Sequence, residues 1–132
     1  MTGSRIQDVG TTASSLQMRC HAIHSAGPDG GTPWIVGVAG EVDYTNSEEF
    51  RARLDELLAF DQPDRVIVDL AGVTRVDSSG LATLLAASRD AGQRHVRFTL
   101  SGLSKSLRHA LERTRLSSLL EIRLTVHQAL QT

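Results

Sequence analysis

Two adjacent serines, Ser78 and Ser79, are the residues whose types and position most favour chemistry in this chain. They follow Asp77 and precede Gly80, where an apolar run ends and a helix is predicted to begin. The first turn of a helix has unpaired N–H groups and a partial positive charge, so a phosphate attached there gains hydrogen bonds and favourable dipole energy. Gly80 allows another backbone or a ligand to come close. Asp and Ser are the commonest N-cap residues, so local chemistry alone favours helix capping and leaves a phosphorylation site as the alternative.

Catalytic chemistry has little support. A serine nucleophile at an elbow needs G-x-S-x-G, and Asp77 stands where its first glycine should be. No Gly-Lys-Ser/Thr occurs, so a phosphate-binding P-loop is not indicated. His21 and His24 lie three apart on a predicted strand, on opposite faces, which is unsuited to a metal pair. We therefore expect no enzyme, no catalytic residue, no metal site and no cofactor. Cys20 alternates with apolar neighbours and is expected to be a small core thiol.

A buried strand and a helix must position the serines. Residues 66–70 form a compact apolar run that predicts a buried strand, and residues 71–77 read as a connection. The helix that follows is predicted to end near Gly92. Its apolar side is expected to consist of Leu81, Leu84, Leu85 and Ser88.

The remaining elements complete an α/β pattern. Residues 16–22 and 34–38 predict an antiparallel hairpin. An apolar stripe over residues 50–58 predicts a helix, and Thr45 and Glu48 fit an S/T-x-x-E capping box at its start. A strand at 96–100, a helix at 103–111, a short strand at 122–124 and a closing helix at 126–130 follow. The order β-β-α-β-α-β-α-β-α predicts an α/β domain with a mixed, mainly parallel sheet and helices packed against it.

Composition limits the location and the partners. The 132 residues fit one domain, and 40% hydrophobic residues suffice for one core. The net charge of −1 gives no broad electrostatic case for nucleic acid or an anionic membrane. A single cysteine suits a reducing compartment, and neither a signal peptide nor an apolar run of about 18 residues is found. We expect a cytoplasmic protein with a mobile tail over residues 1–15 and a domain over residues 16–132.

The segment around the serines resembles the signature of a known family. Val-Asp-Ser-Ser-Gly-Leu at residues 76–81, preceded by Val-Ile-Val-Asp-Leu-Ala-Gly-Val at 66–73, resembles the signature of the STAS domain. This family comprises anti-sigma-factor antagonists and the cytoplasmic domains of sulfate transporters. Gly-Glu-Val-Asp at 40–43 and the leucine-rich residues 107–120 resemble further parts of the family pattern. The resemblance covers roughly residues 16–131.

The resemblance implies a free-standing anti-sigma-factor antagonist. Ser79 matches the serine that the partner anti-sigma factor, a serine kinase that supplies the ATP, phosphorylates. Asp77, Ser78 and Gly80 match the surrounding motif, and Asp43 matches an acidic residue near the phosphoserine, so these four are expected to contact the partner or a nucleotide. The unphosphorylated form would bind the anti-sigma factor and free a sigma factor in a stress response, and phosphorylation at Ser79 would switch it off.

Two positions depart from the family pattern, and some alternatives stay open. Val42 stands where Leu or Ile is usual, and Tyr44 where Leu or Val is common. The alternative function is a constitutive STAS scaffold, or an accessory subunit of a transporter or stress-signalling assembly. The sequence leaves open whether Ser78 takes the phosphate, whether the module binds nucleotide, and what its oligomeric state is.

Overall fold

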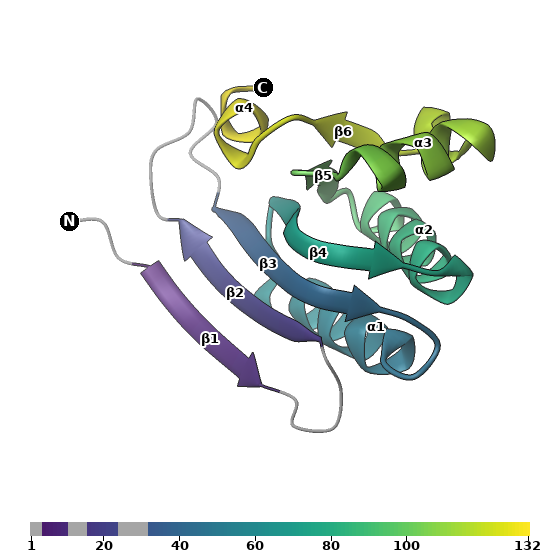
Figure 1. Cartoon of the computed structure of the whole chain (residues 1–132). Coiled ribbons are helices and arrows are strands. Elements are labelled where there is room, and N and C mark those ends of the chain that lie inside the picture. Colours follow the sequence, from purple (N-terminus) through teal and green to yellow (C-terminus); the bar gives the residue numbers. More distant parts are fainter. Residues whose placement is uncertain (1–3, 11–15, 24–31) are drawn as a thin grey trace.

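The computed structural model of the chain describes residues 4–10, 16–23 and 32–132 (Figure 1). Six strands form one sheet in which the spatial order β1-β2-β3-β4-β5-β6 follows the chain. The strands are β1 (Ser4–Gly10), β2 (Gln17–Ile23), β3 (Pro33–Val42), β4 (Arg65–Val76), β5 (Arg97–Ser101) and β6 (Glu121–Arg123). The helices are α1 (Ser47–Glu56), η1 (Leu57–Asp61), α2 (Ser78–Gln93), α3 (Lys105–Arg113), η2 (Leu116–Leu119) and α4 (Val126–Gln131).

The sheet is mixed and mainly parallel. β1, β2 and β3 pair antiparallel, whereas β3, β4, β5 and β6 pair parallel. Each parallel connection contains a helix, as a parallel pair requires. The predicted α/β class, the hairpin of β2 with β3 and the later alternation of strands and helices are confirmed.

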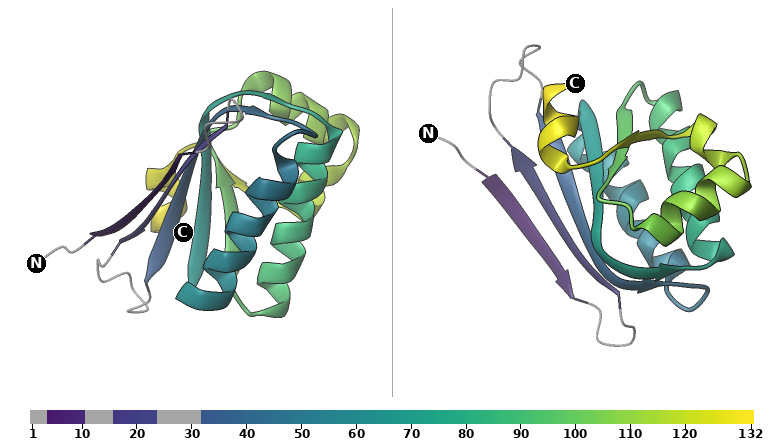
Figure 2. Two further views of the ribbon diagram at one scale, coloured as in Figure 1. Left: turned by 90° about the horizontal axis from the view of Figure 1, so that it is seen from below. Right: turned by 45° about the horizontal axis from the view of Figure 1, so that its top comes forward.

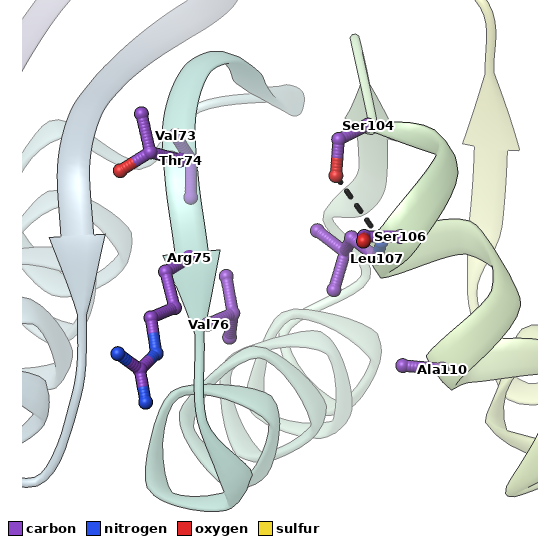
Figure 3. A pocket seen from close by; sticks show the side chains of 8 residues that line it. All are labelled: Val73, Thr74, Arg75, Val76, Ser104, Ser106, Leu107 and Ala110. Atoms are coloured by element: carbon purple, nitrogen blue, oxygen red, sulfur yellow. Dashed lines mark hydrogen bonds between the residues drawn. The ribbon is translucent and has the colours of Figure 1, made fainter.

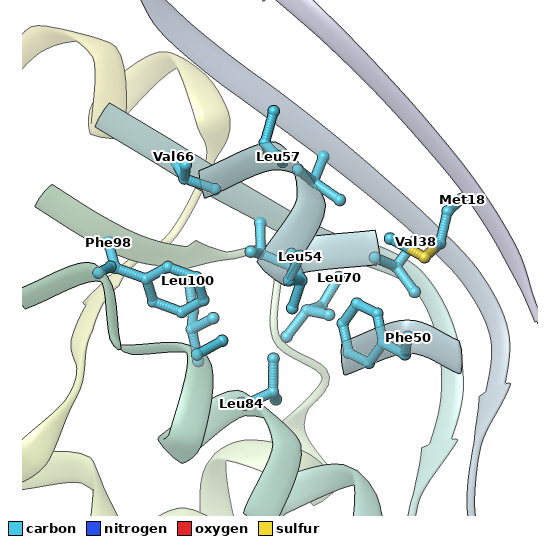
Figure 4. Packing of buried hydrophobic residues seen from close by; sticks show 14 of the residues in the cluster. Met18, Val38, Phe50, Leu54, Leu57, Val66, Leu70, Leu84, Phe98 and Leu100 are labelled. Carbon is cyan, nitrogen blue, oxygen red and sulfur yellow. The ribbon is translucent and has the colours of Figure 1, made fainter. Parts of the chain in front are cut away.

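Helices cover the sheet unequally. Figure 2 shows α1 and α2 on one face and the short α4 on the other. Alternation along β4 explains the arrangement, because Val66 and Val68 belong to the main core while Ile67 packs with Ile35 and with Ala129 of α4. In the main core, Phe50 and other α1 residues lie against the sheet and α2 (Figure 4). The predicted apolar stripe of α1 and η1 is buried, at Phe50, Leu54, Leu57 and Leu58.

The predicted tail over residues 1–15 is wrong for Ser4–Gly10. These residues form β1 and pair antiparallel with β2, from Ser4↔Ile23 to Gly10↔Gln17. An edge strand pairs through its backbone and needs no apolar run, which is why a polar sequence concealed it. The other residues of that segment lie outside the described part.

The strand before the serines is longer than predicted. β4 reaches Val76, and most of the connection predicted at 71–77 is therefore strand. Its register with β3 shifts between Gly37 and Ala39 and again between Gly40 and Glu41, as at a β-bulge. With these bulges, residues 71–76 stay in the strand although the Ala-Gly pair at its start is typical of a loop.

Candidate functional site

The predicted site lies where the carboxyl ends of β3 and β4 meet. Val42 and Val76 are partners at the end of the parallel ladder, and the next backbone N–H, of Asp77, donates to the Val42 carbonyl at 3.0 Å. The loop from β3 to α1 and the start of α2 are therefore side by side (Figure 1). This edge of a parallel sheet is where α/β proteins commonly bind ligands.

Asp77 joins the two segments. Its Oδ1 accepts a hydrogen bond from the Gly80 N–H at 3.0 Å, and its Oδ2 accepts one from the Tyr44 N–H at 3.0 Å. Asp77 is therefore the N-cap of α2, with extended backbone before the helix. The helix capping that local chemistry favours for this segment is performed by Asp77, so neither serine side chain is needed as a cap.

Ser78 and Ser79 open the first turn of α2. Ser78 is exposed and Ser79 is half-buried. Within the described residues neither hydroxyl makes a hydrogen bond, whereas the Ser79 carbonyl accepts from the Thr83 hydroxyl at 3.1 Å. Both hydroxyls are thus chemically free, at a helix start that favours negative charge.

Gly80 is required by packing. A Cβ at this position would lie 2.7 Å from Cγ1 of Val76, 2.9 Å from Cγ1 of Val42 and 3.0 Å from the Val42 carbonyl oxygen. The sequence predicted that another backbone or a ligand comes close to Gly80, and the structure shows that the backbone of β3 does so. Gly80 is buried, so little of it is left to contact a partner, and that contact stays a prediction.

Asp43 lies in the adjacent loop and is held by Thr45. Its Oδ1 accepts from the Thr45 N–H at 2.9 Å and from the Thr45 hydroxyl. The hydrogen bonds from Thr45, first from its hydroxyl and then from its N–H, hold the pKa of the Asp43 carboxyl below its ordinary value, and the charge of Arg75 acts in the same direction. The carboxylate is therefore ionised and available at the same edge as the serines.

Asn46 shapes that loop, and the predicted capping box of Thr45 and Glu48 is wrong. Asn46 is the N-cap residue of α1, without a side-chain capping bond. Its Oδ1 accepts from the Asp43 N–H at 2.9 Å, and its Nδ2 donates to the Glu41 carbonyl at 2.8 Å. Because this buried amide folds the loop back on itself, Thr45 is directed to Asp43.

Tyr44 adds an aromatic surface that the sequence showed only as a departure from the family pattern. Its backbone is fixed by Asp77, while its side chain is 78% exposed. An exposed tyrosine is the kind of residue that anchors a protein interface. An aromatic residue directly after Gly-Glu-Val-Asp is the signal that could have placed it in the site.

Other candidates for chemistry lie away from this edge. Cys20 is buried, and burial raises the pKa of its thiol to about 11, which confirms the prediction of a core thiol. Among the described residues no group of three or more His, Cys, Asp or Glu could hold a metal ion. His24, one of the two histidines weighed as a pair, lies outside the described residues. No described helix is long and apolar enough to cross a membrane.

The chain matches the model of a known domain family. The model of the STAS domain matches residues 28–129, and the chain belongs to this family. The predicted family is therefore confirmed.

Solved structures share this fold at low sequence identity. An anti-sigma factor antagonist from Mycobacterium paratuberculosis is 21% identical, with a TM-score of 0.73 over 92% of this chain and 96% of that one. The Bacillus cell fate determinant SpoIIAA in its phosphorylated form is 18% identical, with a TM-score of 0.59 over 95% and 96%. A sulfate transporter family protein from Wolinella succinogenes is 22% identical, with a TM-score of 0.64 over 73% and 80%.

Proposed function

We propose that this chain is a cytoplasmic anti-sigma-factor antagonist that phosphorylation of Ser79 switches off. The observation that carries the proposal is the Ser79 hydroxyl, which has no hydrogen bond within the described part of the chain and lies in the first turn of α2. Since Asp77 already caps the helix, Ser79 is free to be a substrate. The chain is the substrate of its partner, an anti-sigma factor with serine kinase activity, and carries no catalytic residue of its own.

The switch acts through charge. A phosphate adds about 1.5–2 negative charges at pH 7. Asp43 and Asp77 already place two carboxylates at this edge, and the nearby cation Arg75 interacts with Asp43. A phosphate on Ser79 adds to that negative charge. Binding to a partner surface that fits the neutral serine then carries the cost of desolvating the phosphate and of charge repulsion. The fold is unaffected because the phosphate replaces no internal hydrogen bond.

The partner surface comprises Tyr44, Asp43 and the two serines. Tyr44 supplies apolar area, and ionised Asp43 supplies a fixed acceptor for a cationic partner residue. In this arrangement Ser78 is a neighbour of the phosphosite and Gly80 its packing support.

The binding test compares Ser79→Asp with Ser79→Ala, using the anti-sigma factor kinase that co-purifies with the unphosphorylated chain. We expect Ser79→Ala to bind as tightly as the parent, and Ser79→Asp to bind about tenfold or more weakly, since charge repulsion at an interface costs over about 1 kcal/mol. Ser78→Asp is the matched control, with the same charge one residue away. Equal binding of Ser79→Asp and Ser79→Ala would contradict the proposed switch.

A second candidate is a constitutive scaffold or an accessory subunit of a transporter or stress-signalling assembly. The fold shared with the sulfate transporter family protein from Wolinella succinogenes favours it. A pull-down from native cells separates the two: a kinase favours the antagonist, whereas transporter subunits without a kinase favour the accessory role.

A further inference from the structure

One half of β4 has an open edge. β4 pairs with β5 only from Arg65↔Arg97 to Asp69↔Ser101, yet β4 continues to Val76. Directly after the last β4–β5 pair, Gly102 packs against the β4 backbone, since a Cβ on Gly102 would lie 2.9 Å from the Ala71 nitrogen. Within the described residues, β4 therefore has no strand neighbour on this side from residue 73 to residue 76. Such an edge presents unpaired backbone donors and acceptors.

Helix α3 lies opposite this edge and leaves a pocket of about 180 Å³ between them. Val73 and Val76 line the strand side, and Leu107 and Ala110 line the helix side (Figure 3). We call this space, with the strand edge at residues 73–76, the β4–α3 groove. The hydroxyl of Ser106 lies at its border.

The groove has an apolar interior, and a positive charge lies next to its helix side. The exposed residue Lys105 stands in the chain between Ser104 and Ser106, which both line the pocket. The amino end of α3, where Ser104 is the N-cap, adds its partial positive charge at the groove. Arg75 is exposed on the strand, and its guanidinium points away from α3 (Figure 3). An acidic occupant matches the positive charge of Lys105 and of the amino end of α3.

The size of the pocket indicates the kind of occupant. Pockets that enclose a whole small molecule measure about 300–1,000 Å³, so this pocket is too small for one. It suits an aliphatic side chain of a longer ligand. An open strand edge facing a helix, with a side-chain pocket between them, is the arrangement by which several domains bind extended peptides.

We propose that the β4–α3 groove binds an extended acidic peptide segment of a partner protein. The segment adds as a short strand to residues 73–76 and places one aliphatic side chain between Val76 and Leu107, while its carboxylates face Lys105 and the amino end of α3. This inference goes beyond the proposed function and does not rest on phosphorylation of Ser79.

The test begins with random short peptides displayed on phage and selected against the whole chain. We expect enrichment of peptides with Asp or Glu and an aliphatic residue at alternate positions. The most enriched sequence, made as a synthetic peptide, should shift the backbone amide NMR signals of residues 73–76 and 104–110. Enrichment of basic or purely aromatic peptides, no enrichment over blank support, or shifts confined to other residues would overturn the proposal.

Two variants and one control locate the binding. Ala110→Leu fills the pocket and should weaken binding of the synthetic peptide by about tenfold or more, which corresponds to the loss of one buried side chain. His109→Leu adds the same side chain at the exposed neighbouring position and should leave binding unchanged. Lys105→Glu, at an exposed position, should also weaken binding without unfolding the chain. Unchanged binding by Ala110→Leu and Lys105→Glu, or a groove filled by a second copy of this chain in solution, would contradict it.

Discussion

At the scale of single residues, Asp77 and Gly80 hold the start of α2 in place, and Ser79 lies in that first turn with a hydroxyl that has no described hydrogen bond. Asp77 caps α2 with one carboxylate oxygen and holds the Tyr44 backbone with the other. Gly80 lets the first turn of α2 approach the ends of β3 and β4. The Asp-Ser-Ser-Gly motif is therefore structural at its two ends, and its two middle hydroxyls have no hydrogen bond within the described part of the chain.

Replacing Asp77 with alanine removes a helix cap and a loop anchor together. We expect Asp77→Ala to lower the free energy of unfolding by about 1–2 kcal/mol, as for loss of an N-cap side chain. Urea denaturation measures the change. Ser78→Ala, which removes a hydroxyl without a described partner from the same turn, should stay within about 0.5 kcal/mol of the parent. Equal losses in the two variants would show that Asp77 has no special role.

Two glycines of α2 should respond in opposite directions to alanine. At Gly80 the new Cβ meets Val76 and Val42 within 3 Å, so Gly80→Ala should destabilise the chain by about 1–3 kcal/mol. At Gly92 a Cβ meets nothing within 4 Å, so Gly92→Ala should stabilise the helix by up to about 1 kcal/mol. Thermal unfolding distinguishes the signs. A neutral Gly80→Ala would mean that the close approach is not needed.

At the scale of elements, a charged cluster holds the start of β6 against β5 and β4. Glu121 accepts from Arg97 Nε at 2.9 Å and from the Thr99 hydroxyl, and it faces Arg65 at 3.6 Å and Arg123 at 3.8 Å. Burial raises the pKa of Glu121, but hydrogen bonds from Arg97 and Thr99 and the charges of Arg97 and Arg123 outweigh it, so the pKa falls below its ordinary value.

This depressed pKa makes part of the stability depend on pH. The ionised form of Glu121 is favoured by folding, so its contribution is present above the pKa of the unfolded chain and is lost as pH falls through the folded value. Glu121→Gln should cost about 1–2 kcal/mol at pH 7, less than a fully buried pair because the cluster is partly exposed. The difference between parent and variant should shrink in acid. A constant difference in urea midpoints from neutral to acid pH would contradict this assignment.

How far the elements can be predicted depends on what each one buries. The apolar stripe of α1 and the run at 66–68 mark faces that must be covered, and both were predicted correctly. β1 was missed because an edge strand needs only backbone pairing. The predicted capping box is absent because the Asn46 side chain bonds to the backbone of Asp43 and Glu41 within its own loop, and residue spacing alone does not reveal these bonds. The joining of Tyr44 to Asp77, 33 residues apart, depends on strand register.

At the scale of the whole molecule, the sheet separates the proposed switch from the stabilising cluster. Asp43, Asp77 and the serines lie at the carboxyl ends of β3 and β4, whereas Arg65 and Arg97 lie at the starts of β4 and β5. A phosphate can therefore change one surface without disturbing the charges that hold β6. The sequence motifs predicted that Asp43, Asp77 and the two serines belong to one site. Whether a partner protein binds there depends on the partner's surface as well, so it does not follow from this sequence alone.

The most direct test of the central claim is phosphopeptide mapping of the chain purified from its native cells during growth, starvation and stress. Trypsin cleaves after Arg75 and Arg89, which places both serines on the peptide of residues 76–89, and fragmentation of that peptide distinguishes Ser79 from Ser78. The proposed switch predicts a phosphate on Ser79 whose occupancy changes with conditions. No phosphate under any condition, or a phosphate confined to Ser78, would contradict it.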